Sequence, residues 1–223
     1  MGTDERVIEA AISSFGTRGY EATSLDALAA ELGIRKQTIL YWFPSKEALL
    51  EAVIDRCGAE LAAALEDALA RAGPGWDRVE AVVRSVFRLA LRRPALLGLL
   101  REVSRLGPPA STRLMDELDP LVERARAFLE AEMAAGTMRV TDPRLVLLSA
   151  YSTVIGVATE VEVQRALGVE PTLRAMVVRR RELLAFLRSA LVVPGGGGGV
   201  SDRSGGAPGA GRGARGRDRP ARR

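Results

Sequence analysis

The chain has 223 residues, of which 47% are hydrophobic and 27% charged, a balance typical of a soluble protein with one or two globular domains. It has no histidine and a single cysteine, which excludes an intramolecular disulfide and argues against the usual zinc sites and histidine-based catalysis. We therefore expect no catalytic residue, no metal, no cofactor and a cytoplasmic location. No apolar run approaches the roughly 18–20 residues that span a bilayer, so we also expect no membrane segment.

The net charge of +4 is distributed unevenly along the chain. Residues 194–223 hold seven arginines and two aspartates, a net charge of +5, which leaves about −1 for residues 1–193. Glycine and arginine dominate this last segment, a composition that predicts a disordered tail. Its arginines either add non-specific attraction to DNA or only keep the protein soluble.

The first fifty residues are predicted to form three short helices and the start of a long one. Apolar residues recur at spacings of three and four, which is the helical period. Ser24 and Ser45 offer capping hydroxyls for the second and fourth helices, and Gly33 ends the second. Two helices joined by a tight turn with glycine form a helix-turn-helix. The predicted helices span residues 5–18, 25–32, 35–42 and 46–72.

The stretch 33–46, GIRKQTILYWFPSK, combines basic, aromatic and hydrogen-bonding side chains and contains both lysines of the chain. Cations suit phosphates and polar groups suit base edges, so this mixture favours a helix bound to nucleic acid. Ile39 and Phe43 are four residues apart and are predicted to pack inward. The predicted outward face carries Lys36, Gln37, Leu40 and Tyr41. Local composition alone also fits an ordinary amphipathic helix, but the helix-turn-helix context favours DNA binding.

Residues 7–55 resemble the N-terminal DNA-binding domain of TetR-family transcriptional regulators. The resemblance rests on the order helix, Gly-Tyr, capped helix, Gly-Ile turn, recognition helix and FPSKEAL. It implies an all-α fold in which a three-helix helix-turn-helix domain, 1–50, precedes a helical effector-binding and dimerisation domain, 51–193. It also implies a sequence-specific homodimeric regulator, most often a repressor, that a small effector releases from a double-stranded DNA operator.

The predicted DNA contacts are Ser24, Arg35, Lys36, Gln37, Thr38, Leu40, Tyr41, Trp42 and Lys46. By resemblance, Ser24 and Lys46 are phosphate contacts, whereas Lys36, Gln37 and Thr38 enter the major groove, and Tyr41 and Trp42 touch backbone or bases. Leu40 departs from the family pattern, in which tyrosine is common, and would offer an apolar contact such as one to a thymine methyl. Gln37 replaces a frequent glycine and adds an amide that can read adenine.

The rest of the chain is predicted to be helical as well. Pro120 is expected to kink its helix or to begin a new one. Cys57 is interpreted as a small buried hydrophobe rather than a redox sensor. The helix predicted at 143–167 is apolar over much of its circumference and needs a second surface to cover it. The last two helices are therefore predicted to pair with a second copy across a two-fold axis; an internal pair in a monomer is the alternative. These further helices are predicted at residues 76–92, 94–106, 111–135, 143–167 and 172–193.

The effector pocket has no sequence motif, and its predicted lining is aliphatic with a few aromatic and thioether groups. These residues are Phe87, Leu97, Leu100, Met115, Leu118, Phe128 and Tyr151, with Glu102, Asp116 and Glu160 as polar anchors. Each also fits ordinary core or solvated surface. An apolar or amphipathic organic effector suits this composition best. The competing interpretations are a non-specific DNA-associated helical protein and an enzyme built on a helical bundle, for which the chain offers no nucleotide-binding or nucleophile motif.

Overall fold

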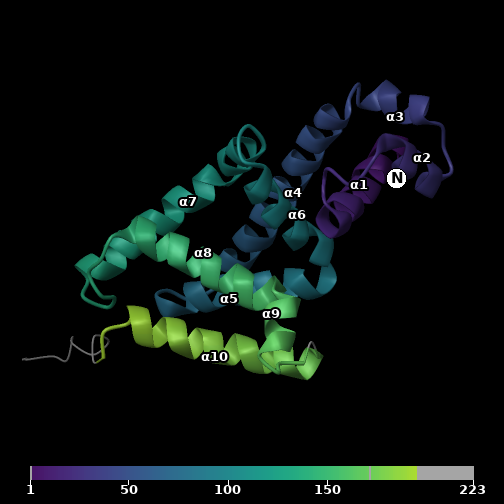
Figure 1. The fold of residues 1–223 in the computed structure, drawn as a ribbon. Helices are drawn as coiled ribbons and strands as arrows, with labels where there is room; N and C mark the ends of the chain where they lie inside the picture. The colour runs from purple at the N-terminus through teal and green to yellow at the C-terminus, as the bar shows by residue number, and fades with distance from the viewer. Residues whose placement is uncertain (1, 171, 195–223) are drawn as a thin grey trace, which may run out of the picture.

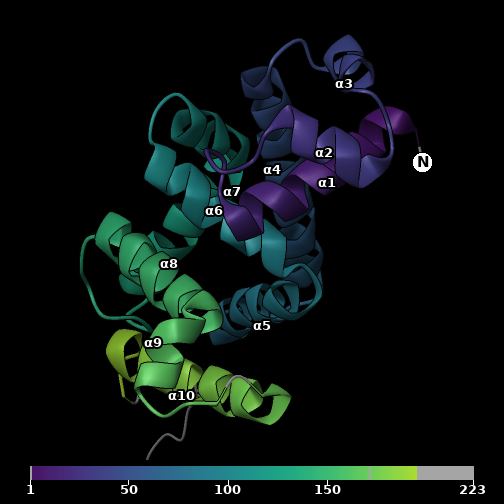
Figure 2. The same ribbon diagram turned by 45° about the vertical axis from the view of Figure 1, so that its right-hand side comes forward.

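The structure is a computed structural model that describes residues 2–170 and 172–194, so the predicted tail lies outside the described part except for Pro194. Within these residues the chain forms ten helices and one isolated antiparallel bridge, between Met138 and Val192. Helices α1–α3 lie at one end of the molecule and α8–α10 toward the other, and α4 runs from the first group to the middle of the molecule, where it packs against α5 and α7 (Figure 1, Figure 2). The prediction of an all-α fold is confirmed.

The bounds of the helices follow the predicted ones closely at the N-terminal end. They are α1 (Thr3–Arg18), α2 (Leu25–Leu32), α3 (Lys36–Trp42) and α4 (Lys46–Ala70). The remaining helices are α5 (Trp76–Arg92), α6 (Pro94–Leu106), α7 (Ala110–Ala134), α8 (Pro143–Thr159), α9 (Val161–Ala166) and α10 (Leu173–Leu191).

Helices α1–α3, which we call the head, pack around the apolar face predicted for α1. Val7, Ile12 and Phe15 of this face are at most 2% exposed. Helix α6 lies along α1 at very close range, because a Cβ atom at Gly98 would be 2.2 Å from the carbonyl oxygen of Gly16. Only glycine on both helices allows this contact, so the backbone of α6 packs directly against the backbone of α1 in the head.

One prediction for the C-terminal helices needs correction, and another is narrowed. The single helix predicted over 143–167 is wrong, because α8 ends at Thr159 and α9 begins at Val161. Glu160 between them has φ −80° and ψ 71°, outside the helical region. The Gln164 side chain donates to the carbonyl oxygen of Val157 at 3.0 Å, which pairs a carbonyl near the end of α8. Of the two alternatives for Pro120, a kink or a new helix, the structure excludes the new helix, since Pro120 lies inside the continuous α7.

Apolar packing joins the head to the rest of the molecule. The main cluster of buried side chains draws on α1–α8 and α10, so no apolar boundary separates the head from the other helices. A smaller second cluster consists of Leu129, Met133, Met138 and Val146. It lies where the end of α7 and the start of α8 meet, and the bridge between Met138 and Val192 ties the end of α10 to it.

Candidate nucleic-acid interface

The turn between α2 and α3 is built by Gly33. Its φ of 66° and ψ of 31° are left-handed, and the N–H of Ile34 bonds back to the carbonyl of Ala29 at 3.0 Å. This arrangement ends α2 in the way glycine favours and turns the chain directly into α3. Helix α3 is then fixed by Ile39, which is fully buried, and by Phe43, which is partly buried against the same cluster. Both predicted packing positions are confirmed.

The face of α3 away from the core is open to solvent. Tyr41 is 79% exposed and Trp42 is 48% exposed, and their rings meet edge to face with centroids 5.2 Å apart. Arg35 and Gln37 are exposed beside them. Exposed aromatic rings among cations and an amide are unusual on a solvent-facing helix and suit a charged, hydrogen-bonding partner. Thr38 is only partly exposed, at the edge of this face.

Lys36 is paired within the head, a feature that sequence reasoning missed. Its Nζ lies 2.8 Å from Asp26 Oδ2 in the first turn of α2. Both side chains are well exposed, at 40% and 70%, so the pair contributes only about 0–1 kcal/mol and phosphate or a base edge can displace Asp26. The spacing of ten residues is no helical period, so no local pattern signals this contact.

Leu40 does not lie fully on the outward face as predicted. It is partly buried and packs against the main apolar cluster beside Ile39. The reason is geometric, because a seven-residue helix that rests on Ile39 also brings its neighbour against the head. An aliphatic side chain at this position therefore has a packing role, whatever it contacts on DNA.

The two predicted phosphate contacts outside α3 both lie at helix N-termini. The Ser24 hydroxyl accepts from the N–H of Ala27 at 3.1 Å, and the Ser45 hydroxyl accepts from the N–H of Ala48 at 3.1 Å. These bonds use acceptor sites, so the exposed Ser24 hydroxyl keeps a proton to donate to a phosphate oxygen. Lys46 occupies the first position of α4, next to the Ser45 cap.

The comparisons with known proteins agree with this geometry. The family model described as "Bacterial regulatory proteins, tetR family" matches residues 7–53. The chain is 32% identical over 147 residues to the HTH-type transcriptional repressor DrrR1 of Streptomyces coeruleorubidus, a match that covers 65% of this chain and 47% of the relative. Residues 7–53 belong to the TetR family of DNA-binding domains. The chain is a DNA-binding transcriptional regulator of the helix-turn-helix type.

Further relatives extend the similarity beyond the head. The uncharacterized HTH-type transcriptional regulator YhgD of Bacillus subtilis is 22% identical over 153 residues, which covers 67% of this chain and 80% of that protein. The ketosteroid transcriptional regulator KstR2 of Mycobacterium tuberculosis superposes with a TM-score of 0.69 at 19% identity, over 86% of this chain and 96% of that one. At this identity the second likeness concerns the fold alone.

The residues predicted to line an effector pocket do not all lie together. Phe87, Leu97 and Leu100 are at most 3% exposed in the main cluster, and Leu118 packs partly buried against it. Phe128 belongs to the second cluster instead. The remaining two, Met115 and Tyr151, are 51% and 47% exposed. The structure thus brings four of the seven to one cluster.

The three predicted polar anchors also lie apart. Glu102 accepts hydrogen bonds from Arg105, and Glu160 forms an ion pair with Arg101 at 2.6 Å. Asp116 is exposed on α7. Two of the three acidic groups are therefore already paired within the protein.

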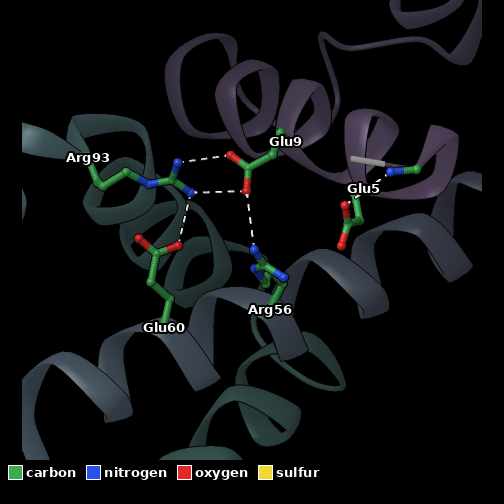
Figure 3. A network of polar contacts seen from close by, with 6 residues as sticks. Glu5, Glu9, Arg56, Glu60 and Arg93 are labelled. Carbon is green, nitrogen blue, oxygen red and sulfur yellow. Dashed lines mark hydrogen bonds and ion pairs between the residues drawn. The ribbon is translucent and has the colours of Figure 1, made fainter.

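Polar side chains form a junction network where the head meets the other helices (Figure 3). Arg93, between α5 and α6, places Nη1 2.9 Å from Glu9 of α1 and Nη2 2.9 Å from Glu60 of α4. Arg56 of α4 approaches Glu9 more loosely, at 4.0 Å. These four residues, Glu9, Arg56, Glu60 and Arg93, also line a cavity of about 450 Å³. Sequence reasoning missed this site, since Glu9, the Arg56 and Glu60 pair, and Arg93 come from three segments far apart in the sequence.

Cys57 is fully buried, as predicted. Burial raises the pKa of its thiol to about 12, which disfavours the thiolate form that redox and metal chemistry need. Across residues 2–170 and 172–194 no group of acidic or cysteine side chains is arranged to hold a metal ion. None of the helices described is both long and apolar enough to cross a membrane.

Proposed function

We propose that this regulator is a homodimeric repressor that binds a two-fold operator through α3 and leaves it when a small apolar or amphipathic effector binds. The observation that carries the DNA-binding part is the exposed face of α3. Gln37, Tyr41 and Trp42 stand out from a helix whose other side is buried, and capped helix N-termini flank them. In this proposal the role is regulatory rather than enzymatic, and the protein acts in the cytoplasm.

We assign phosphate and base contacts to different residues. Lys46 and Ser24 meet phosphates at the N-termini of α4 and α2, where backbone N–H groups add to the attraction. Gln37, Lys36 and Thr38 enter the major groove, and the Gln37 amide is suited to adenine. Tyr41, Trp42 and Arg35 contact the backbone or bases beside them.

Two variants test this division of roles on an operator fragment selected from random duplexes. Lys46→Ala is expected to weaken binding to all sequences and to lower the slope of log affinity against log salt by about 0.9, the value for one phosphate contact. Gln37→Ala is expected to change the preferred base sequence and leave that slope unchanged. If both variants change affinity and sequence preference alike, the assignment is wrong.

The dimer is proposed to form across α8 and α10. Leu145 and Leu148 of α8 are 58% and 61% exposed, and Val177 and Phe186 of α10 are 56% and 60% exposed. Apolar side chains of this size gain about 1.5–3 kcal/mol each when fully buried, so this surface favours a second apolar surface. TetR-family regulators dimerise through their last two large helices, which supports this proposal. A two-fold dimer would set two α3 helices on half-sites one DNA turn apart.

The effector is proposed to be an apolar or amphipathic organic molecule that binds among α5–α8, near Phe87, Leu97, Leu100 and Leu118. Solved structures of similar fold include a ketosteroid transcriptional regulator, a fatty acid degradation regulator and a regulator in complex with choline. For release to follow, the effector must bind the DNA-free arrangement more tightly than the DNA-bound one. A thermal-shift screen of small molecules identifies candidates, and loss of operator binding on adding each hit decides whether it is the effector.

We also propose that residues 1–50 form the DNA-binding domain, 51–193 the effector and dimer domain, and 194–223 a separate basic tail. Deletion of 194–223 tests this division and separates specific from non-specific binding. The protein is expected to keep its preference for operator DNA over mixed-sequence DNA after the deletion. If the deletion abolishes all DNA binding, the non-specific interpretation based on the basic tail is favoured instead.

A further inference from the structure

Tyr20 lies under the N-terminus of α4 and next to Lys46. It is 8% exposed, and the Lys46 ammonium sits over its ring with Nζ 4.1 Å from the centroid. The Tyr20 hydroxyl donates to Glu47 Oε1 at 3.2 Å, and Phe15 meets the ring edge to face at 5.2 Å between centroids. Because it is held at its face, its edge and its hydroxyl, the ring has one orientation.

The backbone of Tyr20 is held on both sides. Its N–H donates to Glu102 Oε1 of α6 at 2.7 Å, and its carbonyl accepts from the N–H of Thr23 at 3.2 Å, one residue before Ser24. Arg105 bonds to the same Glu102 carboxylate at 2.8 and 2.9 Å. Hydrogen bonds from Arg105 and from Tyr20 hold the pKa of Glu102 below its ordinary value, so the acceptor is charged and the bond to Tyr20 is a strong one.

A continuous series of contacts therefore runs from α6 to a predicted phosphate contact. Glu102 fixes the Tyr20 backbone, and the Tyr20 ring supports Lys46. A free lysine side chain must be ordered when it binds, and ordering one such side chain weakens binding by about two- to tenfold. A cation already held over an aromatic face avoids much of this loss.

We propose that Tyr20 is a positioning residue for DNA binding, which holds the Lys46 ammonium where it can meet a DNA phosphate and makes that position depend on α6. The inference rests on the proposed phosphate role of Lys46. It differs from a purely structural role for Tyr20, because it requires the ring to act through one particular lysine.

The signal of Lys46 can be observed separately by NMR, since Lys36 and Lys46 are the only two lysines in the sequence. Reductive ¹³C-dimethylation of the full-length protein keeps both charges and labels these two side chains and the chain terminus. We expect the Lys46 methyl resonance to lie upfield of that of Lys36, because it sits over a ring face, and Lys36→Arg assigns the signals. Tyr20→Phe is expected to keep the upfield shift and Tyr20→Leu to abolish it. A Lys46 resonance at the position of a free lysine in the unsubstituted protein overturns the proposal.

A double-mutant cycle on DNA tests the function of the contact. The probe is a short mixed-sequence duplex, and affinity is followed by fluorescence anisotropy between about 50 and 200 mM salt. We expect Tyr20→Leu to lower affinity about two- to tenfold, Tyr20→Phe to stay within about twofold, and Tyr20→Leu to add nothing in a Lys46→Ala background. If Lys46→Ala itself has no effect, the phosphate role fails. If Lys46→Ala weakens binding but the effect of Tyr20→Leu persists in full beside it, only the positioning inference fails.

The dependence on α6 has its own test, which does not require Tyr20→Leu to fold. Glu102→Ala removes the acceptor of the Tyr20 N–H and is expected to reduce the upfield shift of Lys46. The matched control is Arg101→Ala, one residue earlier on α6, which removes the pair with Glu160 and should leave the Lys46 resonance in place. An unchanged Lys46 resonance in Glu102→Ala overturns the link to α6.

Discussion

The head and the α8–α10 end expose apolar surface of different kinds. Nine of the fourteen large hydrophobic residues exposed in the described chain lie between residues 143 and 191, and eight of these nine are aliphatic or phenylalanine. The head exposes only Tyr41 and Trp42, whose rings carry a polar atom and stand among cations. Rings with a polar edge suit a wet, charged surface such as DNA, whereas aliphatic groups suit another protein surface.

The two ends also differ in how their positions are held. The head is fastened to α6 by the backbone contact between Gly16 and Gly98, by Glu102 and by Arg93. On α8, by contrast, a Cβ at Gly156 would meet no atom within 4 Å, and Leu145 and Leu148 are 58% and 61% exposed. The head is therefore held by contacts within the chain, whereas the α8–α10 end has an exposed face that a partner can cover.

The largest expected effect comes from charging the α8–α10 face. Leu148→Glu combined with Phe186→Glu should fold normally, because both side chains are about 60% exposed, but should dissociate the proposed dimer. Operator affinity is expected to fall by about two to four orders of magnitude, because the second half-site no longer binds as part of the same molecule. Sedimentation velocity and operator titration measure the two effects. Met115→Glu on α7 is the matched control and should leave both unchanged; a double variant that stays dimeric places the interface elsewhere.

The next effect compares the same substitution at the two ends. Gly98→Ala would drive a methyl group into the carbonyl of Gly16, and we expect it to lower the free energy of unfolding by about 1–3 kcal/mol or more. Gly156→Ala meets no atom within 4 Å and should stabilise the protomer by up to about 1 kcal/mol through helix propensity. Urea denaturation of both variants checks this. A Gly98→Ala variant as stable as Gly156→Ala would show that α1 and α6 are less closely packed than described.

Much of the head could be predicted from the sequence because its signals are local. The Ser24 and Ser45 caps, the Gly33 turn and the buried Ile39 each depend on neighbours within a few residues, and all four are confirmed. Leu40 is the exception. Its partial burial depends on how closely α3 rests on the head, which periodicity does not describe.

The contacts that join the head to the rest could not be predicted in this way. Gly16 and Gly98 look like ordinary helical glycines in the sequence. The requirement for glycine at both positions follows only from the close contact of α1 and α6. No glycine or proline marks the break at Glu160 in the sequence. Its position depends on how α8 and α9 pack. Arg93 and Glu9 are 84 residues apart, so their pairing likewise appears only in three dimensions.

A smaller effect is expected from the junction network. Arg93→Gln leaves Glu9 and Glu60 about 30% exposed and without their shared cation, and should lower the free energy of unfolding by about 1–2 kcal/mol. In a Glu9→Gln background the same substitution should have less effect, because one of its two partners is already neutral. Arg126→Gln is the control, since its partners on α7 are about half exposed. Thermal unfolding of the single and double variants measures these differences in stability. If the effects of Glu9→Gln and Arg93→Gln simply add, the interaction between the two side chains does not contribute to stability.

The smallest effect concerns pH. Hydrogen bonds from Arg105 and Tyr20 hold the pKa of Glu102 below the ordinary value of 4.5, so the folded protein binds fewer protons at this site than the unfolded chain. Its contribution to stability is therefore present above the unfolded pKa and is lost as the pH falls through the folded pKa. Glu102→Gln should lower the free energy of unfolding at pH 7, by no more than about 2 kcal/mol, and should approach the stability of the unsubstituted protein once the pH falls below the folded pKa of Glu102.

Glu123, on the surface of α7, provides a control for the stability effect of Glu102. Hydrogen bonds from Arg126 lower its pKa in the same direction, but its side chain is 52% exposed, whereas that of Glu102 is 11% exposed. Water screens the Glu123 pair, so Glu123→Gln should change stability less at pH 7 and depend less on pH. Chemical denaturation of both variants at several pH values decides the matter. Equal pH dependence would make Glu102 an ordinary surface pair, whereas a larger one for Glu102 would identify it as an anchor between α6 and the head.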